Sequence, residues 1–133
     1  MLSGIDVLVV DDEEDARELL KTVFESYGAT VRAAASVAAA MREVQRSVPH
    51  VIVSDIGMTV EDGLSLMRRI RAASARAGGD VPAIALTAYA SASDRDAALA
   101  AGYQAHVAKP FEPDHVVRLI HDLATPTVQS RSG

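Results

Sequence analysis

The chain has no cysteine among its 133 residues. Neither a disulfide framework nor a zinc site with thiolate ligands is therefore possible, which agrees with a reducing compartment. The chain also lacks a basic, then apolar, leader at its start, and no run approaches the roughly 20 apolar residues that a membrane-spanning helix needs. We therefore expect a soluble, cytoplasmic protein that does not enter a membrane.

Positive charge is scarce: 13 Lys and Arg stand against 18 Asp and Glu, for a formal net charge of -5. Nucleic-acid-binding proteins meet phosphate groups with clustered Lys and Arg, so we expect no direct binding to nucleic acid. The length and a hydrophobic share of 49% suit one domain with one core. We expect that domain at 1–124, followed at 125–133 by a polar tail that is a disordered end or a linker stub.

Short apolar runs alternate with helical patterns along the chain. The runs are rich in β-branched residues and predict buried strands at 5–10, 30–34, 51–54, 83–87 and 105–108. One-sided helical spacing, and one alanine-rich segment with a thin apolar stripe, predict helices at 16–24, 37–44, 63–70, 91–101 and 116–123. This alternation implies right-handed crossovers between parallel strands. The predicted fold class is α/β: a doubly wound, five-stranded parallel sheet with helices on both faces.

Residues at the ends of the predicted helices are typical of helix ends. Gly28 and Gly102 lie where helices should stop, and Ser36 is placed to cap the helix that follows it. Pro113 suits the first turn of the last helix. Turn chemistry therefore supports the boundaries that periodicity predicts.

Polar residues follow or end four of the five predicted strands. Asp11 and Asp12 come after the first, Asp55 after the third, Thr87 ends the fourth, and Lys109 follows the fifth. The carboxyl ends of parallel strands share one edge of a sheet, and ligands of open α/β sheets bind beyond that edge. We therefore expect these side chains to converge on one site.

The types of these residues predict phosphoryl chemistry. Three close carboxylates repel one another and need a cation or protons to offset the repulsion. Oxygen ligands select a hard cation, and Mg²⁺ (or Mn²⁺) takes one or two carboxylates together with phosphate oxygens. Lys109 could reach a phosphate oxygen, and the Thr87 hydroxyl could donate another hydrogen bond. With Asp55 as a carboxylate nucleophile, the set is suited to phosphoryl transfer.

Each of these features has an ordinary explanation when taken alone. The acidic run at 11–15 could be a solvated helix start, and Asp55 could be a turn residue. Thr87 could be a simple strand residue and Lys109 a surface lysine. Their joint placement at strand ends favours the functional interpretation, because four unrelated surface residues would not all be expected there.

Four segments resemble the receiver domains of two-component systems. They are 7–12 (VLVVDD), 54–58 (SDIGM) with Asp62 and Gly63 after it, 85–88 (ALTA) and 108–111 (AKPF). The resemblance covers about residues 5–123 and implies a flavodoxin-like topology. The sequences of segments 55–58, 85–89 and 103–110 look most like those of receivers fused to hybrid sensor histidine kinases.

This resemblance implies a regulatory phosphoacceptor rather than an enzyme. Asp55 would accept a phosphoryl group from a sensor histidine kinase or a histidine phosphotransfer protein. Thr87 and Lys109 would hold the phosphoryl oxygens, and the Lys109-Pro110 peptide bond would be cis. An attached kinase domain or a downstream protein would then respond to a face formed by the last two helices and the last strand. Candidates for that face are Val116, Val117 and the alanines Ala97, Ala98, Ala100 and Ala101, although core packing explains most of these residues equally well. The chain would be a monomer or a weak homodimer.

The same resemblance implies a set of metal ligands. Asp12, Asp55 and the backbone carbonyl of Gly57 would bind the magnesium ion directly. Asp11 would assist, either through water or directly. Mn²⁺ is the alternative ion for such an oxygen site.

One position, His106, departs from the common receiver pattern, and two others, Gly57 and Tyr89, bear on how long a phosphoryl group would last. His106 stands where many receivers carry a switching Tyr or Phe, so we hypothesise a switch at Thr87 and His106 that is pH-sensitive or weakly coupled. The alternative is a half-buried histidine with a satisfied hydrogen bond.

Gly57 has no side chain to position a hydrolytic water and Tyr89 could cover the site, so we predict slow autodephosphorylation. Tyr89 could equally be an ordinary surface aromatic.

Other classes of protein fit the sequence less well. An aspartate-nucleophile phosphatase of the haloacid-dehalogenase kind expects a second acid where Gly57 stands, and a chain this short has no cap domain. A flavodoxin-like nucleotide binder needs a Gly-rich first turn, whereas the acidic run at 11–15 would repel phosphate. A non-phosphorylated pseudo-receiver that acts as an interaction module remains the alternative, although it would not need the whole Asp, Thr and Lys set.

Overall fold

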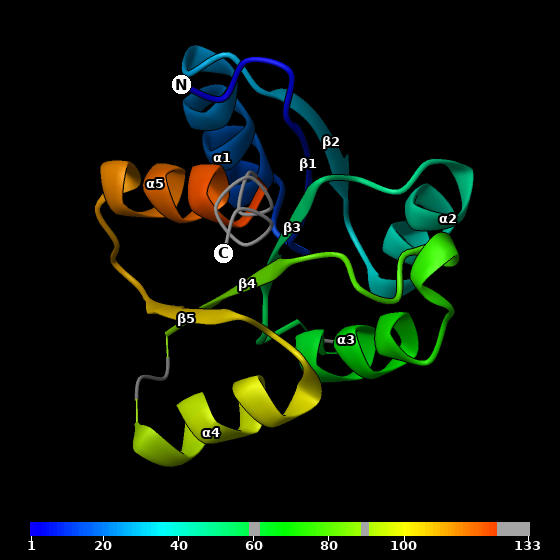
Figure 1. Cartoon of the computed structure of the whole chain (residues 1–133). Helices are drawn as coiled ribbons and strands as arrows, with labels where there is room; N and C mark the ends of the chain where they lie inside the picture. Colours follow the sequence, from blue (N-terminus) through cyan, green and yellow to red (C-terminus); the bar gives the residue numbers. More distant parts are fainter. Residues whose placement is uncertain (59–61, 89–90, 125–133) are drawn as a thin grey trace, which may run out of the picture.

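The computed structural model describes residues 1–58, 62–88 and 91–124, in which strands and helices alternate (Figure 1). The strands are β1 (Asp6–Val10), β2 (Thr30–Ala34), β3 (Val51–Asp55), β4 (Ala83–Thr87) and β5 (Ala105–Ala108). The helices are α1 (Glu14–Ser26), α2 (Val37–Arg46), α3 (Gly63–Arg71), α4 (Ala92–Ala101) and α5 (Pro113–Ala124), with a short 3-10 helix, η1 (Ala75–Ala77). The sequence analysis predicts all of these elements except η1.

All strand pairs are parallel, and the strand order is β2-β1-β3-β4-β5. The chain moves outward from β1 to β2, crosses back to β3 and then continues the other way, so the order reverses between β1 and β3. Asp55 is in register with Leu86, and Thr87 with Ala108. The carboxyl ends of the central strands therefore meet at one edge, and the predicted doubly wound, flavodoxin-like fold is confirmed.

Two hydrophobic layers hold the sheet between its helices. Helices α1 and α5 cover one face, whereas α2, α3 and α4 cover the other (Figure 1). Along β1 the side chains alternate: Val7 and Val9 pack towards α1 and α5, and Leu8 and Val10 towards α2 and α3. Because β1 is buried on both faces from Val7 onward, its last four residues are all apolar, without a polar alternation.

The ends of the helices agree with the predicted caps. The Ser36 hydroxyl accepts a hydrogen bond from the Ala39 N–H at 3.1 Å. Gly102 ends α4 at φ 120°, a conformation that residues with a Cβ rarely adopt. Pro113 is the first residue of α5. Helix α1 starts two residues before the predicted apolar pattern, because Glu14 and Asp15 suit the positive end of a helix dipole.

Two valines of α5 lie inside the protein. Val116 and Val117 are 0% and 1% exposed and belong to the layer between α5 and the sheet. Of the two interpretations of these valines, a partner-binding face or core packing, the structure supports core packing, because the apolar stripe of α5 is used in the core. In α4, by contrast, only Ala98 and Ala101 are buried, so this helix packs through a narrow stripe of small side chains.

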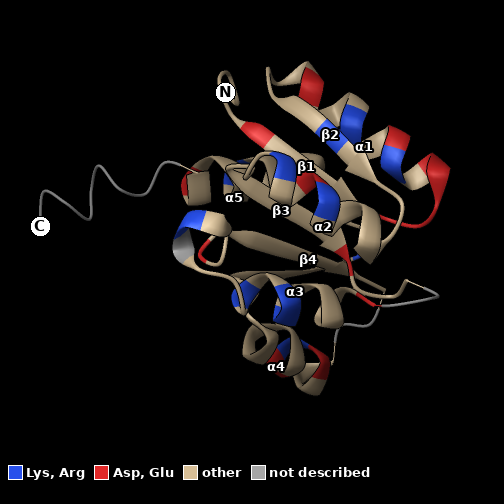
Figure 2. Cartoon of the chain, turned by 90° about the vertical axis from the view of Figure 1, so that its right-hand side faces the viewer, with Lys and Arg blue, Asp and Glu red and all other residues tan. Residues whose placement is uncertain are grey.

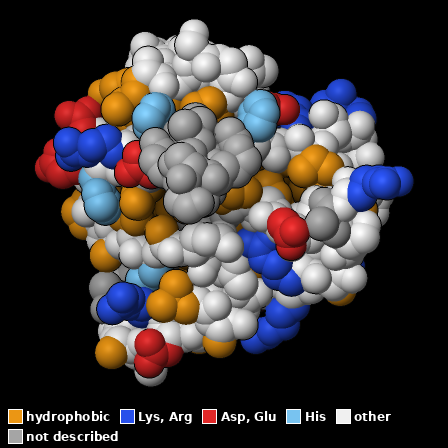
Figure 3. Space-filling view, in the orientation of Figure 1, with side chains coloured by type: hydrophobic (Ala, Val, Ile, Leu, Met, Phe, Trp, Pro, Cys, Tyr) orange, Lys and Arg blue, Asp and Glu red, His pale blue; other side chains and the backbone are white. Residues whose placement is uncertain are grey.

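Charges are unevenly distributed over the surface. In Figure 2 acidic residues dominate the turn between β1 and α1, whereas basic residues gather on α2 and α3. Helix α3 has three arginines in its last turn, where positive charge suits the helix dipole: Arg68, Arg69 and Arg71. On the part of the face in Figure 3 that the grey residues leave open, hydrophobic side chains form small separate patches between polar ones. That view therefore shows no broad apolar surface.

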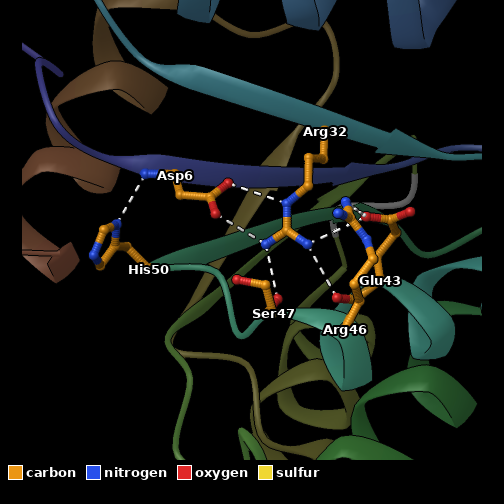
Figure 4. A network of polar contacts seen from close by, with 6 residues as sticks. All are labelled: Asp6, Arg32, Glu43, Arg46, Ser47 and His50. Carbon is orange, nitrogen blue, oxygen red and sulfur yellow. Dashed lines mark hydrogen bonds and ion pairs between the residues drawn. The ribbon is translucent and has the colours of Figure 1, made fainter.

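A polar network joins β1, β2 and α2 on the side away from the acidic edge (Figure 4). The Arg32 guanidinium contacts Asp6 Oδ2 at 3.0 Å and Glu43 Oε1 at 3.2 Å, and it also donates to the carbonyl oxygen of Ser47 at 2.8 Å. Its side chain is only 14% exposed. Arg46 bonds the same Glu43 at 2.7 Å, but from the surface, and this bond lowers the pKa of Glu43. Arg32 thus ties the edge strand β2 to its neighbours.

In the described part of the chain, none of the helices is sufficiently long and apolar to cross a membrane. The predicted tail at 125–133 lies outside the described residues. The proposed extent of the domain, 1–124, therefore stays a prediction.

Candidate functional site

Asp11 follows β1 and is almost fully buried, at 1% exposure. Its Oδ1 accepts a hydrogen bond from the Glu13 N–H at 2.9 Å, and Arg17 Nη1 donates to the Asp11 carbonyl oxygen at 2.9 Å. Its Oδ2 is buried and accepts no hydrogen bond from the described residues. The start of α1 therefore fixes the Asp11 backbone and leaves one buried carboxylate oxygen directed at other partners.

Asp12 and Asp55 complete an acidic cluster with Asp11. One carboxylate oxygen of each residue lies within 4.8 Å of the others. Asp55 is the last residue of β3, its side chain is 13% exposed, and its Oδ1 lies 3.4 Å from the Gly57 backbone nitrogen, which donates to it. The three carboxylates come from strands β1 and β3, the neighbours between which the strand order reverses.

Lys109 brings a positive charge to this cluster from the end of β5. Its Nζ lies 3.3 Å from Asp55 Oδ1 and 3.8 Å from Asp11 Oδ2. Its backbone N–H donates to the Thr87 carbonyl oxygen at 2.7 Å. The Lys109-Pro110 peptide bond is cis, the form that the family resemblance implies. The ammonium group is thus held between two carboxylates that would otherwise repel each other.

A pocket of about 200 Å³ opens above these groups. It is lined by Glu13, Asp55, Gly57, Thr87, Ala88 and Lys109. Thr87 is 3% exposed, so its side chain lies at the floor of the pocket. With the acidic cluster, the structure therefore brings together the predicted residues from four strand ends, whereas Tyr89 lies outside the described residues.

An apolar groove of about 300 Å³ adjoins the same site. Helix α1 supplies Ala16, Leu19, Leu20 and Val23, and the chain between β5 and α5 supplies Lys109, Pro110, Phe111 and Pro113. Leu19 is 61% exposed, so part of this apolar lining is open to solvent. The acidic cluster is thus bordered by a surface suited to an apolar contact.

This geometry agrees with a comparison against known protein families. The model of the response regulator receiver domain matches residues 7–121. The chain belongs to this receiver family.

Relatives extend the comparison to whole proteins. The uncharacterized 14.6 kDa protein in the sodA1 3′ region of Leptolyngbya boryana is 41% identical over 90% of this chain and 89% of its own length. Hybrid signal transduction histidine kinase D of Dictyostelium discoideum is 32% identical over 83% of this chain, which spans only 8% of that kinase. Among solved structures, the receiver domain of the Francisella response regulator 1452 has a TM-score of 0.85 and 28% identity, over 93% of this chain and 99% of that one.

Receiver domains are regulatory phosphoacceptors of two-component systems, and their partners are histidine kinases or phosphotransfer proteins. They bind Mg²⁺ at an acidic pocket. The acidic cluster of this receiver suits such an ion, because its donors are all oxygens and one buried oxygen of Asp11 has no hydrogen-bond donor among the described residues. The residues present therefore fit the metal that the family implies.

Burial raises the pKa of Asp11 above the ordinary value for aspartate. The carboxylates of Asp55 and Asp12 act in the same direction, whereas the Glu13 N–H and the Lys109 ammonium oppose it. The surroundings of Asp11 thus make its ionisation costly.

His106 lies on β5 with its Nε2 buried and without a hydrogen-bond partner among the described residues. His106 is half-buried, as the alternative interpretation expects, but the hydrogen bond of that interpretation is not made at Nε2 within the described residues. The hypothesis of a pH-sensitive or weakly coupled switch stays a prediction.

Sequence reasoning missed two residues at this site. Glu13 lines the pocket, and Arg17 holds the Asp11 carbonyl. Both lie in or next to an acidic helix start, where sequence alone does not tell which side chain turns towards the sheet.

The raised pKa of Asp11 predicts how a substitution would change stability. A raised pKa means that ionised Asp11 destabilises the folded state at neutral pH, and that this penalty disappears as the pH falls through the raised pKa towards 3.8. In metal-free protein, Asp11→Asn should therefore raise the urea midpoint at pH 7, with a gain that shrinks in acid. The exposed Asp96→Asn variant should leave the midpoint unchanged. A lower midpoint for Asp11→Asn at pH 7 would contradict this account.

Proposed function

We propose that this receiver is a phosphoryl-accepting signalling switch in which Asp55 takes the phosphoryl group from a histidine kinase or a histidine phosphotransfer protein. The observation that carries the proposal is the position of Lys109, 3.3 Å from Asp55 Oδ1 and 3.8 Å from Asp11 Oδ2. One cation between two carboxylates, beside a pocket lined by Thr87, matches what an incoming phosphoryl group needs. The proposed setting is the cytoplasm.

Asp11, Asp12, Asp55 and the backbone carbonyl of Gly57 would hold Mg²⁺ or Mn²⁺. When bound, the ion would neutralise charge on the phosphoryl oxygens and on the acidic cluster. The buried Oδ2 of Asp11 supports this assignment, because a buried carboxylate oxygen without a hydrogen bond is costly unless a cation lies near it.

The chemical step needs one carboxylate and one leaving group. An Asp55 oxygen forms a bond to phosphorus while the bond from phosphorus to the donor's histidine nitrogen breaks, and the leaving imidazole takes up a proton. Lys109 and the Thr87 hydroxyl then donate hydrogen bonds to the phosphoryl oxygens. The product is an aspartyl phosphate that carries close to two negative charges at the edge of the sheet.

The new charge would act on α4, β5 and α5 through Thr87 and Lys109. These two residues are already joined by the hydrogen bond from the Lys109 N–H to the Thr87 carbonyl, at 2.7 Å. A shift of Thr87 towards the phosphoryl group would bias an existing equilibrium between two arrangements of that face. An attached kinase domain or a downstream protein would recognise one of them; a monomer or weak homodimer is our expectation for the chain itself.

A pseudo-receiver that is never phosphorylated is the alternative function. Such a module needs the fold but not the acidic cluster, the buried threonine and the lysine together. The convergence of all of these groups at one edge of the sheet favours phosphorylation.

Incubation with acetyl phosphate and Mg²⁺, followed by intact-mass measurement, tests the acceptor. The wild-type chain should gain one phosphoryl group, and Asp55→Ala should gain none because the nucleophile is missing. The control Asp80→Ala, at an exposed aspartate remote from the site, should gain one as wild type does, and EDTA should prevent the reaction. No gain in wild type with either acetyl phosphate or a phosphorylated histidine phosphotransfer protein would favour the pseudo-receiver.

The lifetime of the phosphoryl group tests the role of Gly57. Gly57 is exposed, and a Cβ built there meets no atom within 4 Å, so larger residues fit. Gly57→Glu should shorten the half-life by about tenfold, because a carboxylate could orient a hydrolytic water. Gly57→Ala adds the Cβ without a polar group and should keep the long wild-type half-life. A wild-type half-life of seconds in Mg²⁺ would refute slow autodephosphorylation, including the proposed shielding by Tyr89.

His106 lies on the same side of the sheet as Thr87, since it is in register with Ala85, two residues before Thr87. We predict that His106→Ala reduces the phosphorylation-induced chemical-shift changes of backbone amides in α4 and α5. The exposed His115→Ala variant should keep them. Equal changes in wild type and His106→Ala would end the idea that His106 belongs to the switch.

A further inference from the structure

A path of hydrogen bonds leads from β4 past the phosphoacceptor to the connection between α4 and β5. The Ile56 N–H, directly after Asp55, donates to the Leu86 carbonyl at 3.0 Å, and the Gly63 N–H donates to the Ile56 carbonyl at 3.0 Å. The path ends at Tyr103, whose hydroxyl donates to the Gly63 carbonyl at 2.8 Å. The backbone next to Asp55 is thus linked to a side chain 40 residues beyond Gly63.

Tyr103 is buried, at 3% exposure. Burial raises the pKa of its phenol, the carboxylates of Asp62 and Asp55 act in the same direction, and a hydrogen bond with Ser54 opposes them. The hydroxyl therefore stays protonated, and remains a donor, at any pH at which the protein would work. A buried donor with a fixed partner is a specific restraint on the segment that it contacts.

Gly63 allows three segments to meet at this point. A Cβ built on Gly63 would lie 2.7 Å from the Asp55 carbonyl oxygen and 2.9 Å from the Tyr103 hydroxyl. Both distances are too short for a real Cβ, and the first involves backbone that has little freedom to move. The start of α3, the end of β3 and Tyr103 are therefore in direct contact only because residue 63 has no side chain.

The turn that carries Tyr103 is itself anchored on both sides. Arg71, the last residue of α3, donates to the Gly102 carbonyl from Nη2 at 2.7 Å and from Nε at 3.1 Å. The Gln104 side-chain oxygen accepts from the Ala83 N–H at 2.7 Å. Helices α3 and α4 lie side by side on the same face of the sheet (Figure 1). The residues on both sides of Tyr103 are thus held by hydrogen bonds to α3 and β4.

We propose that Tyr103 is a positioning residue for the phosphoacceptor site. Its hydroxyl holds Gly63, and through Gly63 it holds the Ile56 backbone that lies between Asp55 and Gly57. The consequence for metal binding rests on the proposed function, since Asp55 and the Gly57 carbonyl are two of the metal ligands assigned there. The same contact gives the α4–β5 connection a direct link to the acceptor, separate from Thr87 and Lys109.

Tyr103→Phe removes the hydroxyl and keeps the ring that fills the core. Tyr27→Phe is the matched control, because the Tyr27 hydroxyl also donates a hydrogen bond, to Asp114 Oδ1 at 2.5 Å, but does so on α5. Two quantities are measured on folded protein, as checked by circular dichroism: amide hydrogen exchange at Ile56 and Gly63, and the dissociation constant for Mn²⁺ by electron paramagnetic resonance.

Tyr103→Phe should speed exchange at Gly63 and Ile56 by about fivefold, the equivalent of one hydrogen bond. It should weaken Mn²⁺ binding by about tenfold, as expected for a group that orients metal ligands. Tyr27→Phe should change neither quantity. A tyrosine with a merely structural role would lower the unfolding midpoint without changing the Mn²⁺ affinity of the folded protein.

Two results would overturn the proposal: unchanged exchange at Gly63 in Tyr103→Phe, or faster exchange together with wild-type Mn²⁺ affinity. Failure of the proposed function looks different. In that case the wild-type chain itself would neither bind Mn²⁺ nor accept a phosphoryl group. The hydrogen-exchange measurement would still decide whether Tyr103 holds Gly63 and Ile56.

Discussion

Repulsion among Asp11, Asp12 and Asp55 is the constraint on which the functional part of this structure depends. Their oxygens lie within 4.8 Å of one another, and one of them, on Asp11, is buried without a hydrogen-bond donor among the described residues. Such a cluster persists because the sheet around it is rigid and because Lys109 lies between two of its members. The burial that raises the pKa of Asp11 is the same feature that prepares the site for a cation.

The buried strand that carries Asp55 also explains how phosphorylation of this residue could affect distant parts of the protein. Asp55 ends a strand in which Val51 to Val53 are fully buried, so its backbone has little freedom to adjust. Its contacts lead in two directions, to Thr87 through the pocket and to Tyr103 through Ile56 and Gly63. Helix α4, in which only Ala98 and Ala101 are buried, precedes the turn that carries Tyr103.

Much of the fold could be predicted because its signals are local. The β-branched runs of β1, β3 and β4, the cap at Ser36 and the stop at Gly102 each depend on a few adjacent residues. Val116 and Val117 show the limit of such reasoning, since periodicity finds an apolar stripe without telling whether the core or a partner covers it. The family resemblance likewise concerned segments, not contacts.

By itself the sequence determined the alternation of strands and helices, the family, and the placement of Asp11, Asp12, Asp55, Thr87 and Lys109 at strand ends. Those features follow from local chemistry and from the rule that parallel strands end at one edge. Only the tertiary structure decided that Lys109 lies between Asp55 and Asp11 and that Tyr103 contacts Gly63. Contacts between residues 40 or more positions apart depend on how whole layers pack, and no short pattern in the chain encodes that packing.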